Sequence, residues 1–352
     1  MPTNPLPEPA LHLAARVENR FIGWRTERAR ANGFVPLVIP YTSYGGKGWV
    51  RVLGRVMLNK HTHRLTGEPT GARGWRSFTS IPVQDARVEV EAGGVTNTIT
   101  ANRSGLLDAV VPVDLEPGWH RVEYRVESSA PTFGMVFVVD PSARFGLLSD
   151  IDDTVMMTAL PRPLLAAWHT FVVNEHARTT TPGMPVLYER LTDVNPGTPV
   201  LYLSTGAWNV APTLTRFLSR NLYPAGALLL TDWGPTPDAW FRDGTKHKRD
   251  TLDRLAREFP DIRWLLVGDD GQHDPETYAW FCERHPDQVL AVCIRQLTPG
   301  EAVLAGSGSR AHVRPDGSDV RWFYAYDGAG LAEQLEDAGL LAGSAQQPEV
   351  ES

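Results

Sequence analysis

The sequence has 352 residues, of which 42% are hydrophobic and 21% are charged, and its formal net charge is −7 with a pI near 5.8. This composition is typical of a globular protein long enough for two domains, and the acidic balance argues against nucleic-acid binding by broad electrostatics. Only two cysteines are present, Cys282 and Cys293, which excludes a disulfide scaffold and a four-thiolate zinc site.

Residues 1–32 are expected to form a proline-rich leader followed by a helix. Leu13, Val17, Phe21 and Trp24 recur near helical spacing, and arginines crowd other positions of the same stretch. A basic amphipathic helix can lie on an anionic membrane, although packing on its own domain is the more common role. The sequence shows no secretory signal and no apolar run of about 20 residues, so we expect a cytoplasmic protein, with peripheral membrane contact as an alternative.

Residues 33–140 show short β-type runs separated by Gly and Pro, which predicts a β-sandwich. The stretch 98–106 is similar to a hairpin of transthyretin-like and immunoglobulin-like modules. No catalytic constellation is visible, so we expect structural support or partner binding. The expected strands are Phe34–Ile39, Val50–Leu58, Arg87–Glu91, Thr96–Thr100, Leu106–Val113, His120–Val126 and Phe133–Val139.

Residues 144–342 alternate apolar strands with amphipathic helices, which predicts a parallel sheet covered on both faces, a Rossmann-like α/β domain. Ligands of such sheets bind beyond the carboxyl ends of the strands. The polar tail, residues 343–352, is expected to be disordered. The expected strands are Phe145–Ser149, Pro199–Ser204, Ala227–Leu230, Arg263–Val267 and Val289–Ile294, and the expected helices are Met184–Leu191, Val210–Arg220, Lys248–Phe259 and Glu276–Glu283.

An acidic cluster follows the first of these strands, where Asp150, Asp152 and Asp153 precede Thr154. Carboxylates this close repel one another unless a cation lies among them or one is protonated. Helix capping is the alternative role, because Asp and Thr cap helices well. We expect Asp153 to be a helix N-cap rather than a ligand.

The other strand ends supply the remaining groups of a site for phosphoryl transfer. Ser204 and Thr205 end the second strand, Lys248 opens a helix, and the run 268–274 follows the fourth strand. A carboxylate nucleophile can form an acyl-phosphate, and a second carboxyl two residues on can protonate the leaving alcohol and then deprotonate water. Mg²⁺ prefers oxygen ligands, while a lysine and a hydroxyl can hold phosphoryl oxygens.

These residues resemble the four motifs of the haloacid dehalogenase superfamily, beginning with D-x-D-x-T at Asp150–Thr154. Residues 144–298 are further similar to the catalytic domain of actin-patch-type phosphatidate phosphatases. The phrases that carry this resemblance are LLSDIDDTVMMT, PGMPVLYERL, LYLSTGAWN, HKRDTLDRL, FPDIRWLLVGDDGQHDPETYAWF and AVCIRQL.

The resemblance implies a role for each residue of the predicted site. Asp150 would be the nucleophile and a Mg²⁺ ligand, and Asp152 the general acid/base, whose backbone carbonyl is a second ligand. Ser204 would bind the phosphoryl group, Lys248 would balance its charge, and Asp269 would be the third metal ligand. Thr154 would shape the loop, and Thr205 would adjust the pocket. Asp274 would be a supporting or alternative metal ligand. Asp270 stands where the family more often has serine, which leaves the assignment of the metal ligands among these aspartates open.

Several neighbouring residues have alternative roles. Lys246 is the alternative to Lys248 as the cation, while His247 and His273 are expected to be hydrogen-bond partners or solvated residues rather than metal ligands. Arg295 could meet substrate phosphate or pair with a neighbouring Asp. Trp208 is expected to pack rather than line the pocket.

The resemblance implies a Mg²⁺-dependent phosphomonoester phosphatase for phosphatidate or a related lipid phosphate. The apolar run Leu164–Val173 would suit a hydrophobic leaving group, or equally burial against the rest of the protein. The alternatives are a phosphatase for a soluble phosphomonoester and a non-catalytic partner-binding module with a vestigial site.

Overall fold

The computed structural model describes residues 26–59, 81–157, 179–232, 237–271, 273–298, 300–301 and 319–342. Most of the expected N-terminal helix, the run Leu164–Val173 and the tail from residue 343 lie outside these residues. Residues 26–31 are helical, and Arg30 in this segment donates two hydrogen bonds, of 2.9 and 2.7 Å, to the carboxylate of Glu127. For Arg30, the structure therefore supports packing on its own domain.

The N-terminal half contains a strand at each of the seven predicted positions. Alternation produces them: in β4, the buried residues Val88 and Val90 alternate with exposed Arg87 and Glu89. The strands are β1 (Val35–Pro40), β3 (Trp49–Asn59), β4 (Arg87–Ala92), β5 (Val95–Thr100), β6 (Leu106–Pro112), β7 (Gly118–Val126) and β8 (Thr132–Val138). The prediction missed β2 (Ser43–Gly46), which pairs with β8 in parallel.

Hydrogen bonds join these strands in the order β1-β3-β2-β8-β7-β4-β5, and β6 pairs with β3. The pairs β1–β3, β4–β5 and β4–β7 are antiparallel. The sandwich arrangement of this sheet stays a prediction.

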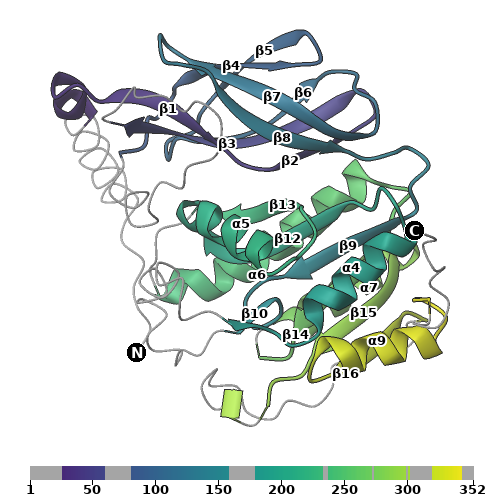
Figure 1. Cartoon of the computed structure of the whole chain (residues 1–352). Helices are drawn as coiled ribbons and strands as arrows, with labels where there is room; N and C mark the ends of the chain where they lie inside the picture. Colours follow the sequence, from purple (N-terminus) through teal and green to yellow (C-terminus); the bar gives the residue numbers. More distant parts are fainter. Residues whose placement is uncertain are drawn as a thin grey trace. The chain divides into compact units, whose positions relative to one another are not determined.

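The C-terminal half contains the predicted parallel sheet. Its strands are β9 (Phe145–Asp150), β12 (Val200–Ala207), β13 (Ala227–Thr231), β14 (Arg263–Asp269), β15 (Val289–Arg295) and β16 (Arg321–Ala325). Their order is β13-β12-β9-β14-β15-β16, so β9 lies between β12 and β14 (Figure 1). Successive residues are buried along β9, β13 and β14, which means that both faces of the sheet are covered. The fold is therefore mixed α/β with a parallel sheet.

Helices flank this sheet (Figure 1). Helix α4 packs against α9, and α6 packs against α7 and β12. The helices are α4 (Met184–Val194), α5 (Ala211–Arg220), α6 (Pro237–Glu258), α7 (Asp274–Arg284) and α9 (Gly328–Asp337). The 3₁₀ turn η3 (Trp208–Val210) precedes α5, and the 3₁₀ turn η4 (Pro286–Gln288) follows α7.

The prediction that Lys248 opens a helix is wrong, because Lys248 lies in the interior of α6. Gly244 lies within this helix, although glycine is a poor helix former. In the structure, a Cβ atom on Gly244 would lie 3.0 Å from the Cγ2 of Thr205, so glycine allows α6 to approach β12 closely. Packing against the sheet thus outweighs the helix propensity at this position.

The described residues divide into two compact units. One is drawn from Met1–Tyr41, Arg51–Val113 and Arg121–Met135, and the other from Thr42–Val50, Asp114–His120 and Val136–Ser352. The second unit also holds the short antiparallel pair of β10 (Met156–Met157) and β11 (Thr179–Thr180). Among the described helices, none is long and apolar enough to cross a membrane.

Candidate active site

The candidate site is built on Asp150, the last residue of β9. Parallel pairing places Leu203 of β12 opposite Asp150 and Val267 of β14 opposite Ser149, so Ser204 and Asp269 lie at the same edge of the sheet. The order of the strands reverses between β9 and β14. In open α/β sheets, ligands bind beyond the carboxyl ends of the strands at such a reversal, which is where these side chains lie.

Buried hydroxyls hold the strand beneath Asp150. The Oγ of Ser149 donates to the carbonyl oxygen of Asp150 (2.6 Å) and lies 2.6 Å from the hydroxyl of Tyr188. The hydroxyl of Tyr278 donates to the carbonyl of Val267 (2.9 Å). These hydrogen bonds were not predicted from the sequence, although a lone serine inside an apolar strand signals a buried hydrogen bond.

Lys248 is the cation of the site. Its Nζ donates to Oδ1 of Asp150 (2.6 Å) and to Oδ1 of Asp274 (2.5 Å), and all three side chains are at least 95% buried. Burial lowers the pKa of the Lys248 ammonium, but the charges of Asp150 and Asp274 outweigh it and raise this pKa above its ordinary value. Lys248 is therefore charged, whereas the alternative cation, Lys246, is an exposed residue paired with Asp250.

Asp274, the first residue of α7, supports both Lys248 and β14. Its Oδ1 accepts from Lys248, and its Oδ2 accepts from the backbone N–H of Asp269 (3.3 Å). A Cβ on Gly268 would lie 2.7 Å from that Oδ2, so glycine at this position makes room for the carboxylate. Because both oxygens already accept hydrogen bonds, Asp274 is better suited to hold the site together than to bind a metal.

The carboxylates of Asp150, Asp269 and Asp274 lie together, and those of Asp150 and Asp269 suit a divalent cation. They are buried, and one oxygen from each lies within 4.8 Å of the others. The Oδ2 atoms of Asp150 and Asp269 have no hydrogen-bond partner among the described residues, and such buried oxygens are costly unless something binds them. The Oδ1 of Asp269 accepts from the N–H of Gly271 (2.7 Å), which aims the side chain. The residues present therefore fit Mg²⁺, which oxygen ligands hold.

The protonation of these groups in the metal-free protein follows from their surroundings. Burial raises the pKa of the Asp150 carboxyl well above its ordinary value, and the negative charge of Asp274 adds to this effect, while Lys248 opposes it. Burial likewise raises the pKa of Asp269, with further contributions from Asp274 and Asp150. A bound cation would relieve this repulsion, because it favours the ionised carboxylates.

Ser204 and Asp152 form a hydrogen-bonded pair across the strand ends. The Oγ of Ser204 donates to Oδ2 of Asp152 (2.8 Å) and accepts from the N–H of Gly206 (2.9 Å). The side chain of Asp152 is buried and adjoins the nucleophile candidate, whose pKa its charge raises. Thr205 contributes differently, since its methyl group faces Gly244 of α6 and its carbonyl accepts from Thr231.

The prediction that Asp153 caps a helix is wrong. Asp153 lies in a tight turn that leads into β10, and its φ is 59°. The N–H groups of Val155 and Met156 donate to the carbonyl of Ile151, and that of Asp153 donates to the carbonyl of Met156. Aspartate is among the few residues that adopt left-handed backbone readily, which explains the turn. Thr154 is fully buried within it.

The remaining candidate residues have other partners or surroundings. Oδ1 of Asp270 accepts from the N–H of Leu297 (2.8 Å), which gives Asp270 a structural partner in the next loop. Burial lowers the pKa of His247 to about 4, so this side chain is neutral. His273 is the N-cap residue of α7, and Trp208 is buried, in agreement with packing.

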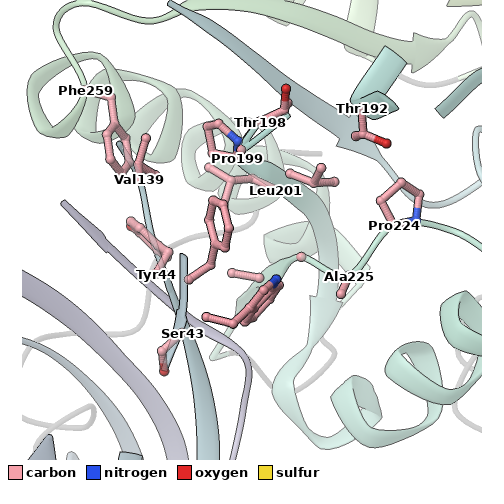
Figure 2. A pocket seen from close by; sticks show the side chains of 16 residues that line it. Ser43, Tyr44, Val139, Thr192, Thr198, Pro199, Leu201, Pro224, Ala225 and Phe259 are labelled. Carbon is pink, nitrogen blue, oxygen red and sulfur yellow. The ribbon is translucent and has the colours of Figure 1, made fainter. Parts of the chain in front are cut away.

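A separate cavity of about 220 Å³ lies in the second unit, away from the acidic residues. Figure 2 shows Tyr44 and Phe259 on one side of it, opposite Pro224 and Ala225. Its lining includes the amino ends of β12 and β13, whereas the acidic cluster lies at the carboxyl ends. None of the predicted site residues lines this cavity, so it is not the candidate active site.

Residues 145–296 match the family model described as the catalytic domain of phosphatidate phosphatase APP1. This match confirms the predicted resemblance of residues 144–298 to the catalytic domain of actin-patch-type phosphatidate phosphatases. The chain is 27% identical over 151 residues to phosphatidate phosphatase APP1 of Saccharomyces cerevisiae and 25% identical over 152 residues to uncharacterized protein C29B5.04c of Schizosaccharomyces pombe. Each match covers 43% of this chain and 25% of the relative, so the chain matches about a quarter of each relative's length.

These matches support the prediction of a hydrolase acting on phosphoric monoesters. Solved structures give weaker similarities. A carbohydrate acetylesterase from Xanthomonas citri covers 77% of this chain and 73% of its own, with 10% identity and a TM-score of 0.28. PhoD covers 74% of this chain and 70% of its own, with 10% identity and a TM-score of 0.30. Scores this low carry no conclusion.

Replacing Asp269 by asparagine is expected to remove the stabilisation of the protein by Mg²⁺. A ligand at 100 times its Kd stabilises the folded state by about 2.7 kcal/mol, which raises Tm by roughly 5–10 °C for a domain of this size. The shift should be smaller at about pH 5.5 than at about pH 7.5, because the raised pKa values of Asp150 and Asp269 let protons compete with the metal. Thermal unfolding with and without Mg²⁺ measures both effects.

Asp270→Asn is the matched control for Asp269→Asn. It removes the same charge one residue away, and its amide oxygen can still accept the hydrogen bond from Leu297. The control should therefore keep most of the Mg²⁺-induced shift. A full shift in Asp269→Asn would contradict the proposed ligand.

Proposed function

We propose that the chain is a Mg²⁺-dependent phosphomonoester phosphatase that acts through an aspartyl-phosphate on Asp150, with phosphatidate or a related lipid phosphate as the favoured substrate. The observation that carries this proposal is the buried cluster of Asp150, Lys248, Asp269 and Asp274 at the carboxyl ends of the central strands. The match to the APP1 catalytic domain supports the same reaction class.

The first half of the reaction uses Asp150 and Asp152. A carboxylate oxygen of Asp150 attacks phosphorus, the bond from phosphorus to the alcohol oxygen breaks, and the Asp152 carboxyl gives its proton to the departing alkoxide. Lys248 holds the Asp150 carboxylate through the 2.6 Å hydrogen bond to its Oδ1. The other oxygen of Asp150, Oδ2, accepts no hydrogen bond among the described residues, so it can attack phosphorus or bind a cation.

The second half returns the enzyme to its starting state. The Asp152 carboxylate takes a proton from water, and the water oxygen attacks the phosphorus of the aspartyl-phosphate. The bond from phosphorus to Asp150 then breaks, and inorganic phosphate leaves. Ser204, which donates to Asp152 in the structure, orients this carboxyl and can turn its hydroxyl to a phosphoryl oxygen.

Asp150 and Asp269, with the backbone carbonyl of Asp152, would hold Mg²⁺, which neutralises charge on the phosphoryl oxygens when bound. We also propose that residues 144–342 have the haloacid dehalogenase-type fold. The protein is cytoplasmic in this proposal and reaches its lipid substrate by peripheral contact with the membrane.

A phosphate-release screen distinguishes the candidate functions. The purified protein with Mg²⁺ is given phosphatidate in detergent micelles, lysophosphatidate, sugar phosphates, nucleotides and an aryl phosphate. We expect kcat/KM on phosphatidate to exceed that on each soluble monoester. Preference for a soluble monoester would favour the soluble-substrate alternative and contradict the lipid assignment.

The same screen tests whether the site is vestigial. Undetectable turnover on every substrate, in a protein that Mg²⁺ stabilises against thermal unfolding, would contradict catalysis and favour a non-catalytic partner-binding module. Release of phosphate from the aryl phosphate alone would support the reaction but not the lipid substrate.

A further inference from the structure

Arg295 is a buried arginine beside the candidate site. It is the last residue of β15, where it is paired in register with Asp269 of β14 on one side and Ala325 of β16 on the other. Only 2% of Arg295 is exposed, and a buried guanidinium is costly unless its donors are hydrogen-bonded and its charge is paired. The acceptors of these hydrogen bonds therefore indicate what Arg295 does.

The guanidinium joins three segments of the chain. Its Nη1 donates to the backbone carbonyl of Asp153 (2.7 Å), its Nη2 to Oε1 of Glu301 (2.6 Å), and its Nε to the carbonyl of Tyr326 (3.3 Å). Of the two roles expected for Arg295, pairing with an acidic residue is the one present, although the partner is a glutamate. The contact to Asp153 leads directly to the turn that follows the nucleophile candidate.

That turn begins directly after Asp150 and contains Asp152 and Asp153. Asp153 follows Asp152 and has a φ of 59°, a left-handed conformation that few residues other than glycine, asparagine and aspartate adopt. Internal hydrogen bonds from Val155 and Met156 to Ile151 close the turn, and Arg295 adds a hydrogen bond from outside it. A shift of the Asp153 carbonyl would move the backbone between Asp150 and Asp153.

Glu301 holds the other end of this link. Its Oε2 accepts from the N–H and the Oγ of Thr298, both at 2.8 Å, and its own N–H donates to the Oγ of Thr298 (3.4 Å). These reciprocal bonds form a capping box, a pattern that the spacing of Thr298 and Glu301 signals in the sequence. Burial raises the pKa of Glu301, but the hydrogen bonds from Arg295 and Thr298 outweigh it and hold this pKa below its ordinary value, so Glu301 is ionised.

We propose that Arg295, held by Glu301, is a positioning residue that fixes the Asp153 turn and thereby the geometry of Asp150 and Asp152. The proposal rests on the proposed function, because it concerns the same reaction. The ion pair with Glu301 neutralises the guanidinium and aims it at backbone carbonyls, which distinguishes this role from binding substrate phosphate. A misplacement of about 1 Å can lower a rate about 10²-fold, so the expected effect is on kcat.

The test compares Arg295→Lys, Arg295→Met and Glu301→Gln with the wild type on an aryl phosphate in Mg²⁺. Arg295→Lys keeps the charge but loses the planar fork of donors, and we expect kcat to fall roughly 10- to 100-fold with KM changed by less than about threefold. Arg295→Met should lose at least as much, and Glu301→Gln less. A rise in KM with an unchanged kcat would show phosphate binding instead and overturn the proposal.

Arg190→Lys is the matched control. Arg190 of α4 also joins a glutamate, Glu336 (2.6 Å), and a backbone carbonyl, that of Ala342 (2.5 Å), and it is largely buried. If loss of a buried arginine pair only destabilises the fold, both lysine variants should lower Tm, and neither should change kcat. An unchanged kcat in Arg295→Lys and Glu301→Gln would therefore overturn the proposal, even if Arg295→Met failed to fold.

Hydrogen–deuterium exchange separates this proposal from the proposed function. The amides of Val155 and Met156 should exchange faster in Arg295→Lys than in the wild type and in Arg190→Lys, whether or not the protein turns over substrate. Unchanged exchange would overturn the positioning role. An inactive wild type with faster exchange in Arg295→Lys would contradict the proposed phosphatase while supporting the held turn.

Discussion

Asp150→Asn is expected to abolish phosphate release and to lower kcat by about 10⁴-fold or more. The amide has the size of the carboxylate and can still accept the hydrogen bond from Lys248 through its oxygen, but it cannot form an acyl-phosphate. The measurement is kcat on an aryl phosphate in Mg²⁺, together with mass spectrometry of acid-quenched enzyme. The wild type should show a phosphoryl adduct on the peptide that carries Asp150, and the variant should show none.

Asp153→Asn is the matched control for this change. It removes a carboxylate from the turn that follows Asp150, and asparagine adopts the left-handed backbone of this position as readily as aspartate. The backbone carbonyl that Arg295 holds is unchanged, so most of the activity should remain. Full activity in Asp150→Asn, or an adduct on a different residue, would contradict the proposed nucleophile.

The position of Asp150, Ser204 and Asp269 at one edge of the sheet could be predicted because it depends only on sheet geometry. Each residue ends, or nearly ends, an apolar run, and the carboxyl ends of parallel strands share one edge of the sheet. Lys248 was also predicted to be the cation of the site, although the predicted start of its helix was wrong. The choice of Lys248 rested on the resemblance, while its position near the acidic residues follows from the packing of α6 against β12.

The sequence alone does not show which of Asp269, Asp270 and Asp274 has a carboxylate oxygen left to bind a metal. This depends on how α7 begins, because Asp274 reaches Lys248 and the Asp269 N–H only when Gly268 leaves room for its carboxylate. It also depends on the loop after β15, where Leu297 engages Asp270. These are tertiary contacts between segments that sequence spacing alone does not bring together.

Two other features had a signal too weak to use. The sequence of β2, Ser43–Gly46, has two glycines and no alternation, so only its pairing with β8 makes it a strand. The turn at Asp153 looked like a helix cap because Asp and Thr favour both structures. What decides for the turn is long-range: the guanidinium of Arg295 meets the Asp153 carbonyl across 142 residues of chain.

Lys248→Met is expected to lower kcat about 10³-fold, because it removes the charged donor that holds Asp150 and balances the buried carboxylates. It should also change how stability depends on pH. Lys248 lowers the pKa of Asp150, so the variant raises that pKa further above the value of an unfolded chain. A carboxyl with a raised pKa stabilises the fold at low pH and loses that contribution as pH rises through its folded-state pKa. In EDTA, the Tm of Lys248→Met should therefore approach that of the wild type at about pH 5 and fall below it at about pH 8.

Lys246→Met supplies the control, since it removes a lysine two residues away on the same helix. Lys246 is 72% exposed and pairs with Asp250, which is 61% exposed, and exposed pairs of this kind contribute little. Its kcat and the pH dependence of its Tm should match those of the wild type. A loss of activity in Lys246→Met with full activity in Lys248→Met would reverse the assignment of the cation. If the Tm of Lys248→Met differed from that of the wild type by the same amount at both pH values, the Lys248 ammonium would not offset the buried negative charge. That result would contradict the electrostatic account of the site.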